Sequence, residues 1–310
     1  MKKLFIILVL CSLHIAEAIA QTTIKESVEP LLTCRWGQGN PFYIKCPSKT
    51  DSTTGEIKYC VVGCVACAMG QIMYYHKYPT QGKGTKSYSF IYDVSADFEN
   101  TYYRWDDMLD RYIIGLYTEE NADAVATLLY HCGVASGMIY TTSGSGAFTN
   151  FSGVTNSFTD YFRYDPESIK YLKRSDYTKE EWLQIIYENL SQGLPIFYTG
   201  NSPSLGGHAF VIDGYNTEGL VHINWGWKGI DDGYYDIDLT KSGTDFCNNQ
   251  TMVVGIKPLL TDHIESIVNN DTFSEKQSSS GNGKTYNIMG QEVTNGKGLL
   301  IRNGKKIFIK

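Results

Sequence analysis

Three cysteines lie within eight residues, in the stretch CVVGCVACAMGQIMYYHKYP that covers positions 60 to 79. Cys60, Cys64 and Cys67 could hold a metal, form disulfides, pack as small apolar side chains or supply a nucleophile. Their C-x3-C-x2-C spacing is compatible with an iron–sulfur cluster, but such a cluster is a poor choice outside a reducing compartment. Zinc would need a second pair of clustered Cys or His ligands, which the sequence lacks. We therefore expect no metal and no other cofactor.

The first twenty residues indicate the compartment. They read MKKLFIILVLCSLHIAEAIA, with two lysines, an apolar stretch and small residues before Gln21. This pattern is typical of a secretory signal peptide, so we predict a secreted protein that is periplasmic, at the cell surface or extracellular. No later stretch has 18 consecutive apolar residues, and no membrane-spanning segment is expected. Removal of Cys11 leaves seven of the eight cysteines, an odd number, so at least one has no disulfide partner within the chain.

Composition and patterning divide the mature chain into parts. A net charge of −6 and a pI near 5.6 argue against nucleic-acid binding, which needs a basic surface. Residues 21–258 are dense in periodic apolar patterns, whereas residues 259–284 are polar and rich in Ser, Gly and Asn, as in a linker. Residues 285–310 hold short apolar runs, two of which flank the hairpin signal Asn303-Gly304. We expect this C-terminal β module to sort or anchor the protein; the alternative is an extra sheet packed on the main domain.

The elements that would position the cysteines follow from periodicity. From Cys64 onward, apolar residues recur at positions 65, 68, 69, 72 and 73, which predicts a helix that follows Gly63 and stops before Pro79. A second helix is predicted over 178–193, with Thr178 as its N-terminal cap. The rest of the main domain alternates short strands with Gly, Asn and Asp. Helices followed by a run of antiparallel strands indicate an α+β fold.

The predicted position of Cys64 favours a reactive thiol. At the N-terminus of a helix, the positive end of the backbone dipole and the unpaired N–H groups stabilise a thiolate. The preceding glycine lets other groups approach the backbone of Cys64. Position alone leaves open whether Cys64 is a nucleophile, a packing residue or half of a disulfide, and a nucleophile needs a base.

Two histidines on neighbouring predicted strands are candidates for that base. His208 starts a strand directly after Gly206-Gly207, at the rim of the sheet, where a ligand has room. If the hairpin turns about position 216, His208 lies opposite Asn224 with Cβ atoms about 5 Å apart, and Asn224 can hold the imidazole by a hydrogen bond. A slip of one residue would place the two on opposite faces. His222 has no such partner and is interpreted as a strand surface residue.

Five blocks of the sequence read, in order, WGQGNPFY, GCVACAMGQIMYYHKYP, SGSGAF, GGHAFVIDGY and HINWGWKGIDDGYYDI. In this order they resemble the streptopain family of bacterial cysteine peptidases, and the resemblance covers residues 28 to 257. It implies a papain-like fold with two lobes, one bearing helices and one built on an antiparallel sheet. It also implies cleavage of proteins by a Cys–His pair.

The resemblance assigns roles to individual residues. It makes Cys64 the nucleophile and His208 the general base and acid. It places Asn224 as the residue that orients the histidine, Trp225 as the shield of their hydrogen bond, and Gln38 as an oxyanion-hole donor. Substrate contacts are expected from two glycine-rich segments, and a plain surface loop is the alternative for the first of them. The expected contact residues are Ser145, Gly146, Ala147, Gly206 and Gly207.

The chain also departs from the family. Its members carry a long pro-segment that keeps them latent, whereas about fifteen residues separate the predicted signal cleavage site from Trp36. A separate proteinaceous inhibitor could supply the latency instead. Six cysteines occur besides Cys64, and Cys67 could trap the nucleophile in an oxidised state. The C-terminal β module resembles the sorting domains of the type IX secretion route.

These observations predict a secreted cysteine endopeptidase that cleaves protein or peptide substrates through a thioester acyl-enzyme. An alternative within the same class is a papain-like amidase or transferase acting on a non-protein substrate. An alternative of a different class is a catalytically silent surface binding module. That module would have no need to keep Cys64, His208, Asn224 and Gln38 together.

Overall fold

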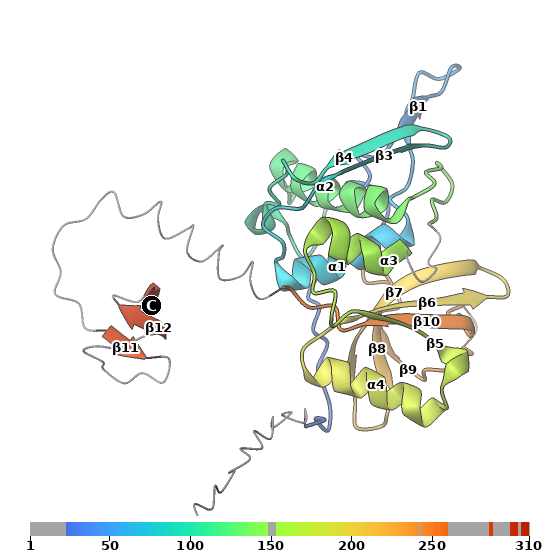
Figure 1. Cartoon of the computed structure of the whole chain (residues 1–310). Helices are drawn as coiled ribbons and strands as arrows, with labels where there is room; N and C mark the ends of the chain where they lie inside the picture. The colour runs from blue at the N-terminus through green and yellow to red at the C-terminus, as the bar shows by residue number, and fades with distance from the viewer. Residues whose placement is uncertain are drawn as a thin grey trace, which may run out of the picture. The chain divides into compact units, whose positions relative to one another are not determined.

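The computed structural model describes residues 23–147, 153–241 and 243–259, together with three strands between residues 285 and 309 (Figure 1). The chain divides into two compact units, Met1–Asp262 and His263–Lys310. The predicted signal peptide, residues 1–20, and residues 260–284 of the predicted linker lie outside the described residues.

The first half of the larger unit is organised around two long helices, α1 and α2, which pack against each other (Figure 1). Two short antiparallel hairpins, β1–β2 and β3–β4, accompany them and were not predicted. The elements of this half are β1 (Ser48–Thr50), β2 (Ile57–Tyr59), α1 (Cys64–His76), β3 (Thr85–Ser89), β4 (Asp93–Asp97), the 3-10 helix η1 (Trp105–Asp107), α2 (Glu119–Ser136), α3 (Gly153–Asn156) and the π-helical turn η2 (Ser157–Tyr161).

Helix α1 begins at Cys64, as the apolar periodicity predicts. It ends at His76, where Lys77 adopts a left-handed backbone conformation with φ of 50° and closes the last turn before Pro79. Gly70 lies against α2, because the side chain of Leu129 occupies the space that a Cβ atom at position 70 would need. The absence of a side chain there lets the two helices approach closely.

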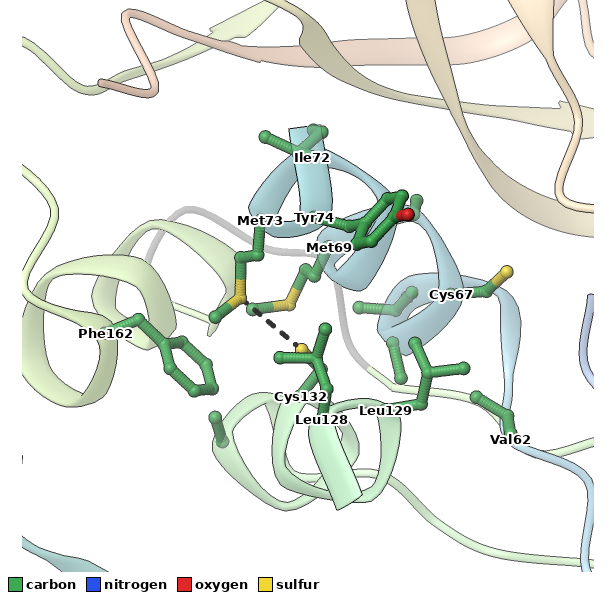
Figure 2. Packing of buried hydrophobic residues seen from close by; sticks show 14 of the residues in the cluster. Val62, Cys67, Met69, Ile72, Met73, Tyr74, Leu128, Leu129, Cys132 and Phe162 are labelled. Atoms are coloured by element: carbon green, nitrogen blue, oxygen red, sulfur yellow. Dashed lines mark hydrogen bonds between the residues drawn. The ribbon is translucent and has the colours of Figure 1, made fainter. Parts of the chain in front are cut away.

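Sulfur-containing side chains fill much of the space between the two helices (Figure 2). The thiol of Cys132 on α2 lies 3.6 Å from the thioether sulfur of Met73 on α1, and both residues are fully buried. Met69 and Phe162 pack in the same cluster. Polarisable, unbranched side chains suit such irregular interiors, so Cys132 acts as a small packing residue.

The second half of the larger unit is a six-stranded antiparallel sheet with one long helix. Its strand order is β5-β10-β6-β7-β8-β9. Helix α4 has the predicted capping box, in which Thr178 and Glu181 bond each other's backbone N–H groups. The elements are β5 (Lys170–Lys173), the 3-10 helix η3 (Arg174–Asp176), α4 (Lys179–Ser191), β6 (Ile196–Ser202), β7 (Gly206–Tyr215), β8 (Val221–Asn224), β9 (Gly233–Tyr235) and β10 (Asn248–Val254).

The two faces of this sheet belong to two hydrophobic cores. Helix α1 lies over one face and α4 covers the other (Figure 1). Strand β6 shows the alternation, because Phe197 packs in the core with α1 whereas Ile196 and Tyr198 pack in the core with α4. The α+β fold expected from the order of helices and strands is confirmed. Among the described residues, no helix is both long and apolar enough to cross a membrane.

The smaller unit contains three antiparallel strands, β11 (Thr285–Asn287), β12 (Gly298–Arg302) and β13 (Lys305–Ile309). Arg302 pairs with Lys305, so β12 and β13 are the two strands predicted on either side of the Asn303-Gly304 signal. The dipeptide itself lies outside the described residues.

Candidate active site

Cys64 is the first residue of α1 and follows Gly63 in an unusual backbone conformation. Gly63 has φ of 90°, which side chains rarely tolerate, and a Cβ atom there would lie 2.6 Å from the sulfur of Met138 and 3.1 Å from the carbonyl of Ser145. Glycine at position 63 therefore satisfies two requirements, the backbone turn into the helix and the close approach of the loop around Ser145. Cys64 as a whole residue is partly exposed.

Two opposing effects act on the pKa of the Cys64 thiol. Burial raises this pKa, because a thiolate is poorly solvated in the site. The backbone N–H groups of Ala209, Val65 and Cys64 itself oppose burial and lower the pKa. These donors place the sulfur between the start of α1 and strand β7. Since Ala209 directly follows His208, they also place the thiol next to the histidine.

His208 on β7 is buried and its ring is oriented by a backbone carbonyl. Its Nε2 atom lies 2.9 Å from the carbonyl oxygen of Trp225. A carbonyl can only accept a hydrogen bond, so Nε2 carries the proton, and in the neutral ring Nδ1 is left with a lone pair. Burial lowers the pKa of His208 to about 4. The imidazole is therefore neutral near pH 7 and able to accept a proton at Nδ1.

Aromatic rings cause much of this burial. The ring of Trp227 is stacked 4.9 Å from the imidazole, Phe246 lies 5.2 Å away and Trp225 6.2 Å away, measured between ring centroids. Trp225 was expected to shield the histidine, and its fully buried ring lies against that of Trp227. Trp227 is closer to the imidazole than Trp225 is.

The predicted register between His208 and Asn224 is wrong. Asn224 pairs with Val211 rather than with His208, and a bulge between Ile212 and Gly214 shifts the ladder. The side chain of Asn224 makes three hydrogen bonds, none of them to the imidazole: it accepts from the Nε2 of Gln71 and the N–H of Gly226, and it donates to the carbonyl of Cys34. The physical reason is the displaced turn and the bulge, which together move Asn224 along the strand.

Asn224 nevertheless acts on the histidine through one peptide unit. The N–H of Gly226, which bonds Asn224, and the carbonyl of Trp225, which bonds His208, belong to the same peptide group. The preceding N–H, that of Trp225, donates to the carboxylate of Asp232 at 2.9 Å. Asn224 and Asp232 thus fix the orientation of the carbonyl that holds the imidazole. Asp232 was not identified from the sequence, since no local pattern marks it.

Gln38 lies near the start of α1. Its backbone carbonyl accepts a hydrogen bond from Val62, two residues before Cys64. Its side-chain amide is partly exposed and makes no hydrogen bond within the described part of the chain. The position is compatible with an oxyanion-hole donor.

The loop expected to contact substrate is internally hydrogen-bonded. The hydroxyl of Ser145 is buried and bonds the backbone of Thr141, and Gly146 forms a two-way bridge with Ile139. The Ser145 hydroxyl therefore serves the loop itself, whereas its carbonyl lies beside Gly63. Ala147 is partly exposed, and Gly206 and Gly207 are exposed at the start of β7.

The seven described cysteines are free thiols, and five are buried: Cys34, Cys46, Cys60, Cys67 and Cys132. Cys67 lies 3.8 Å from the carbonyl of Gly37 and 3.9 Å from that of Gly226, and burial raises its pKa. It packs as a protonated thiol where these segments meet, so an oxidative trap would require it to leave both carbonyls. Among the described residues, no group of three or more His, Cys, Asp or Glu side chains could hold a metal ion.

His222, interpreted from the sequence as a surface residue, is partly buried and has a partner. Its Nδ1 atom lies 2.7 Å from the carboxylate of Asp213, which is fully buried. The same carboxylate accepts from the N–H of Leu32, and the backbone carbonyl of Asp213 accepts from Leu31. The pair therefore ties the N-terminal segment to β7, a contact between residues far apart in sequence.

Comparison with known proteins shows that the chain is similar to named peptidases. The model of the peptidase C10 family matches residues 36–235. Streptopain from Streptococcus pyogenes is 33% identical over 246 residues, which are 72% of this chain and 60% of streptopain. The thiol protease/hemagglutinin PrtT from Porphyromonas gingivalis is 33% identical over 245 residues, which are 74% of this chain and 26% of PrtT. The chain thus spans less than two thirds of the length of these relatives.

Two solved structures have a similar fold. Active wild-type interpain A, a cysteine protease of Prevotella intermedia, has 41% sequence identity and a TM-score of 0.68, with 75% of this chain and 96% of interpain A covered. A fragment of prointerpain A from the same organism has 40% identity and a TM-score of 0.66, with 76% of this chain and 74% of the fragment covered. These likenesses confirm the expected papain-like fold.

Proposed function

Because the chain belongs to the peptidase C10 family, as its resemblance to streptopain indicated, we propose that it is a cysteine endopeptidase acting on protein or peptide substrates. One observation carries the proposal. The bond from His208 Nε2 to the Trp225 carbonyl leaves Nδ1 free to act as a base, and the N–H of the next residue, Ala209, bonds the thiol of Cys64 at the start of a helix. A Cys–His pair of this kind activates a nucleophile for acyl transfer.

The proposed reaction proceeds in two stages. His208 Nδ1 takes the thiol proton as the sulfur of Cys64 attacks the substrate carbonyl, which becomes a tetrahedral oxyanion. The backbone N–H of Cys64 and the amide of Gln38 would stabilise that charge, and one such donor is typically worth about 3 kcal/mol. The imidazolium then protonates the leaving amine as the C–N bond breaks. Water, deprotonated by the same imidazole, hydrolyses the thioester and restores the thiol.

Casein digestion by matched variants tests the proposal. The wild type should digest casein, whereas Cys64→Ala and His208→Ala should lose digestion while remaining folded by circular dichroism. Cys67→Ala serves as the control, because it removes a neighbouring thiol that the mechanism does not use. Digestion that survives in Cys64→Ala would contradict the assignment, and a folded wild type that leaves casein intact would favour an amidase, a transferase or a binding module.

We further propose that the protein is exported and that its C-terminal β module sorts or anchors it. The support is the signal-like pattern of residues 1–20 and the separate unit that holds β11 to β13. N-terminal sequencing of the mature protein should begin at Gln21, and deletion of residues 285–310 should change its distribution between cells and medium. A mature chain that retains Met1 would contradict export. A separate inhibitor remains a prediction.

A further inference from the structure

A polar groove opens on the sheet face that belongs to the core with α1. Its volume is about 600 Å³, and it is lined by residues of β5, η3, β6 and β10 and by Cys247 before β10. None of the residues assigned above to the catalytic machinery lines it. The groove is therefore a possible binding site separate from the catalytic residues.

One row of residues across the sheet leads from the nucleophile into this groove. Ala209 pairs with Thr199, Thr199 with Thr251, and Thr251 with Lys173. Residues paired directly across antiparallel strands project from the same face. The amide of Ala209 lies close enough to the Cys64 thiol to lower its pKa. The row thus spans three strand spacings, each about 4.8 Å, from the nucleophile to Lys173.

Small residues keep the groove open at the end near the nucleophile. At this end of β7, the positions on this face are Gly207 and Ala209, and neither carries a side chain large enough to close the groove. The side-chain oxygen of Asn201, which lines the groove, lies 3.1 Å from the point where a Cβ atom at position 207 would be. Because Gly207 is exposed and has no side chain, a substrate side chain can pass over it and enter the groove beside Asn201.

The lining of the groove is positively charged although the chain carries a net charge of −6. It contains Lys173 and Arg174 and no carboxylate. Arg174 is engaged elsewhere, because it donates to the carbonyl of Tyr177 and lies 3.9 Å from a carboxylate oxygen of Asp238. Lys173 is exposed and has no ion pair with any residue that the structure describes. One unpaired cation is therefore available in the groove.

Two threonines supply a hydrogen-bond donor between Lys173 and the nucleophile. The hydroxyl oxygens of Thr199 and Thr251 are 2.7 Å apart, so one hydroxyl donates to the other. The second hydroxyl proton remains for a different acceptor. A carboxylate, which only accepts hydrogen bonds, is matched by this free donor together with the ammonium group of Lys173.

We propose that the groove binds a glutamate side chain of the substrate close to the cleaved bond, with Lys173 as counter-ion and the Thr199–Thr251 pair as donor. Glutamate fits better than aspartate because its longer side chain bridges more of the distance between Ala209 and Lys173. The proposal rests on the proposed endopeptidase function and adds a substrate preference to it. Lys173 is thus a specificity-determining residue rather than a catalytic one.

Matched peptides test the preference. A panel is made in which each position flanking one cleaved bond carries glutamate, glutamine, leucine or lysine, and kcat/KM is measured for each peptide. At one position glutamate should exceed glutamine in kcat/KM by up to about 5-fold, the upper end of what an ion pair in contact with solvent contributes. The ratio should fall as salt is raised, because ions screen the pair. Lys173→Gln should cleave the glutamate and glutamine peptides at equal rates. Lys173→Glu should cleave the lysine peptide faster than the glutamate peptide.

Lys170→Glu is the matched control, because it makes the same charge change on the same strand while Lys170 lies outside the groove lining. It should leave the glutamate-to-glutamine ratio unchanged. Equal rates for both peptides at every position, or a ratio that survives in Lys173→Glu, would overturn the groove proposal and leave the endopeptidase intact. If the wild type cleaves no peptide, binding of the same peptides to Cys64→Ala still tests the groove proposal. Tighter binding of the glutamate peptide that is lost when Lys173→Glu is added supports the proposal, and equal affinities for the glutamate and glutamine peptides overturn it.

Discussion

Trp227 should set the acidic limit, the lowest pH at which the proposed Cys64–His208 pair reacts. Its ring is partly exposed and stacked 4.9 Å from the imidazole, closer than the rings of Phe246 and Trp225. Burial is the main cause of the low pKa of His208, about 4 against an ordinary value of 6.5. Trp227→Ala would admit water to this side of the ring and favour its protonated form, so the pKa of His208 should rise.

The size of the effect follows from the burial. The full difference in pKa corresponds to about 3 kcal/mol of lost imidazolium hydration. If removal of Trp227 restores somewhat under half of that hydration, the acidic limit should move from about pH 4 to about pH 5, and at pH 4.5 the fraction of active pair should fall about threefold. At pH 7 both proteins are fully in the active state, so little change is expected from protonation there.

The assay is the pH profile of Cys64 alkylation by limiting iodoacetamide, mapped by peptide mass spectrometry. Mapping is needed because Cys247 is also partly exposed. Tyr234→Ala is the control, since it removes an exposed ring that contacts His222 instead of His208. The control should keep its limit near pH 4. An unmoved limit in Trp227→Ala, or an equal movement in both variants, would refute the role assigned to the aromatic shield.

Two further predictions concern the support of the histidine and the pH dependence of stability. Asp232→Ala should lower kcat about tenfold with little change in KM, because it leaves the buried N–H of Trp225 unpaired at a cost of about 1–3 kcal/mol. Asp232→Asn should restore most of the lost kcat, because its side chain keeps a hydrogen-bond acceptor. Equal losses of kcat in both variants would contradict this role of Asp232. Burial lowers the pKa of His76, His131 and His208 to about 4, so each is neutral when folded and protonated when unfolded below pH 6.5. In urea unfolding, the free energy of unfolding should be highest above pH 6.5 and should fall toward pH 4, by up to about 1.4 kcal/mol per pH unit for each histidine. A free energy of unfolding that is constant over this range would contradict the low pKa values of these histidines.

The start of a helix at Cys64 could be predicted from sequence because the signals are local. The start of α1 is specified by Gly63 and by the apolar period that follows Cys64, and both are visible in a window of a dozen residues. The start of α4 is equally local, since Thr178 and Glu181 form its capping box within four residues. For the same reason, the run of strands after α4 was recognised from its alternation and turn residues.

The register of β7 and β8 could not be predicted because two features outside the pattern set it. Asn216 is the first residue of the turn rather than its centre, since its side chain accepts from the N–H groups of Glu218 and Leu220. The bulge between Ile212 and Gly214 then adds a further shift. A displacement of this kind changes every cross-strand pair, which moved Asn224 away from the imidazole.

Polar contacts between residues far apart in the chain could not be predicted from local sequence patterns either. Asp232 supports the backbone beside His208 only because the chain returns after β8, and the His222–Asp213 pair gains its meaning from the N-terminal segment that it binds. Neither residue stands in a distinctive motif. What sequence does supply is the type of chemistry, while the partner of each polar group depends on packing between segments far apart in the chain.

Trapping of the acyl-enzyme tests the central claim most directly. The wild type is mixed with a peptide ester, quenched in acid within milliseconds and measured by intact mass, and the adduct is mapped by digestion at low pH. We expect a mass increase on Cys64 equal to the acyl part of the substrate, which is absent in Cys64→Ala and strongly reduced in His208→Ala. An adduct on Cys247 or another cysteine, or undiminished peptide cleavage by Cys64→Ala, would contradict the central claim.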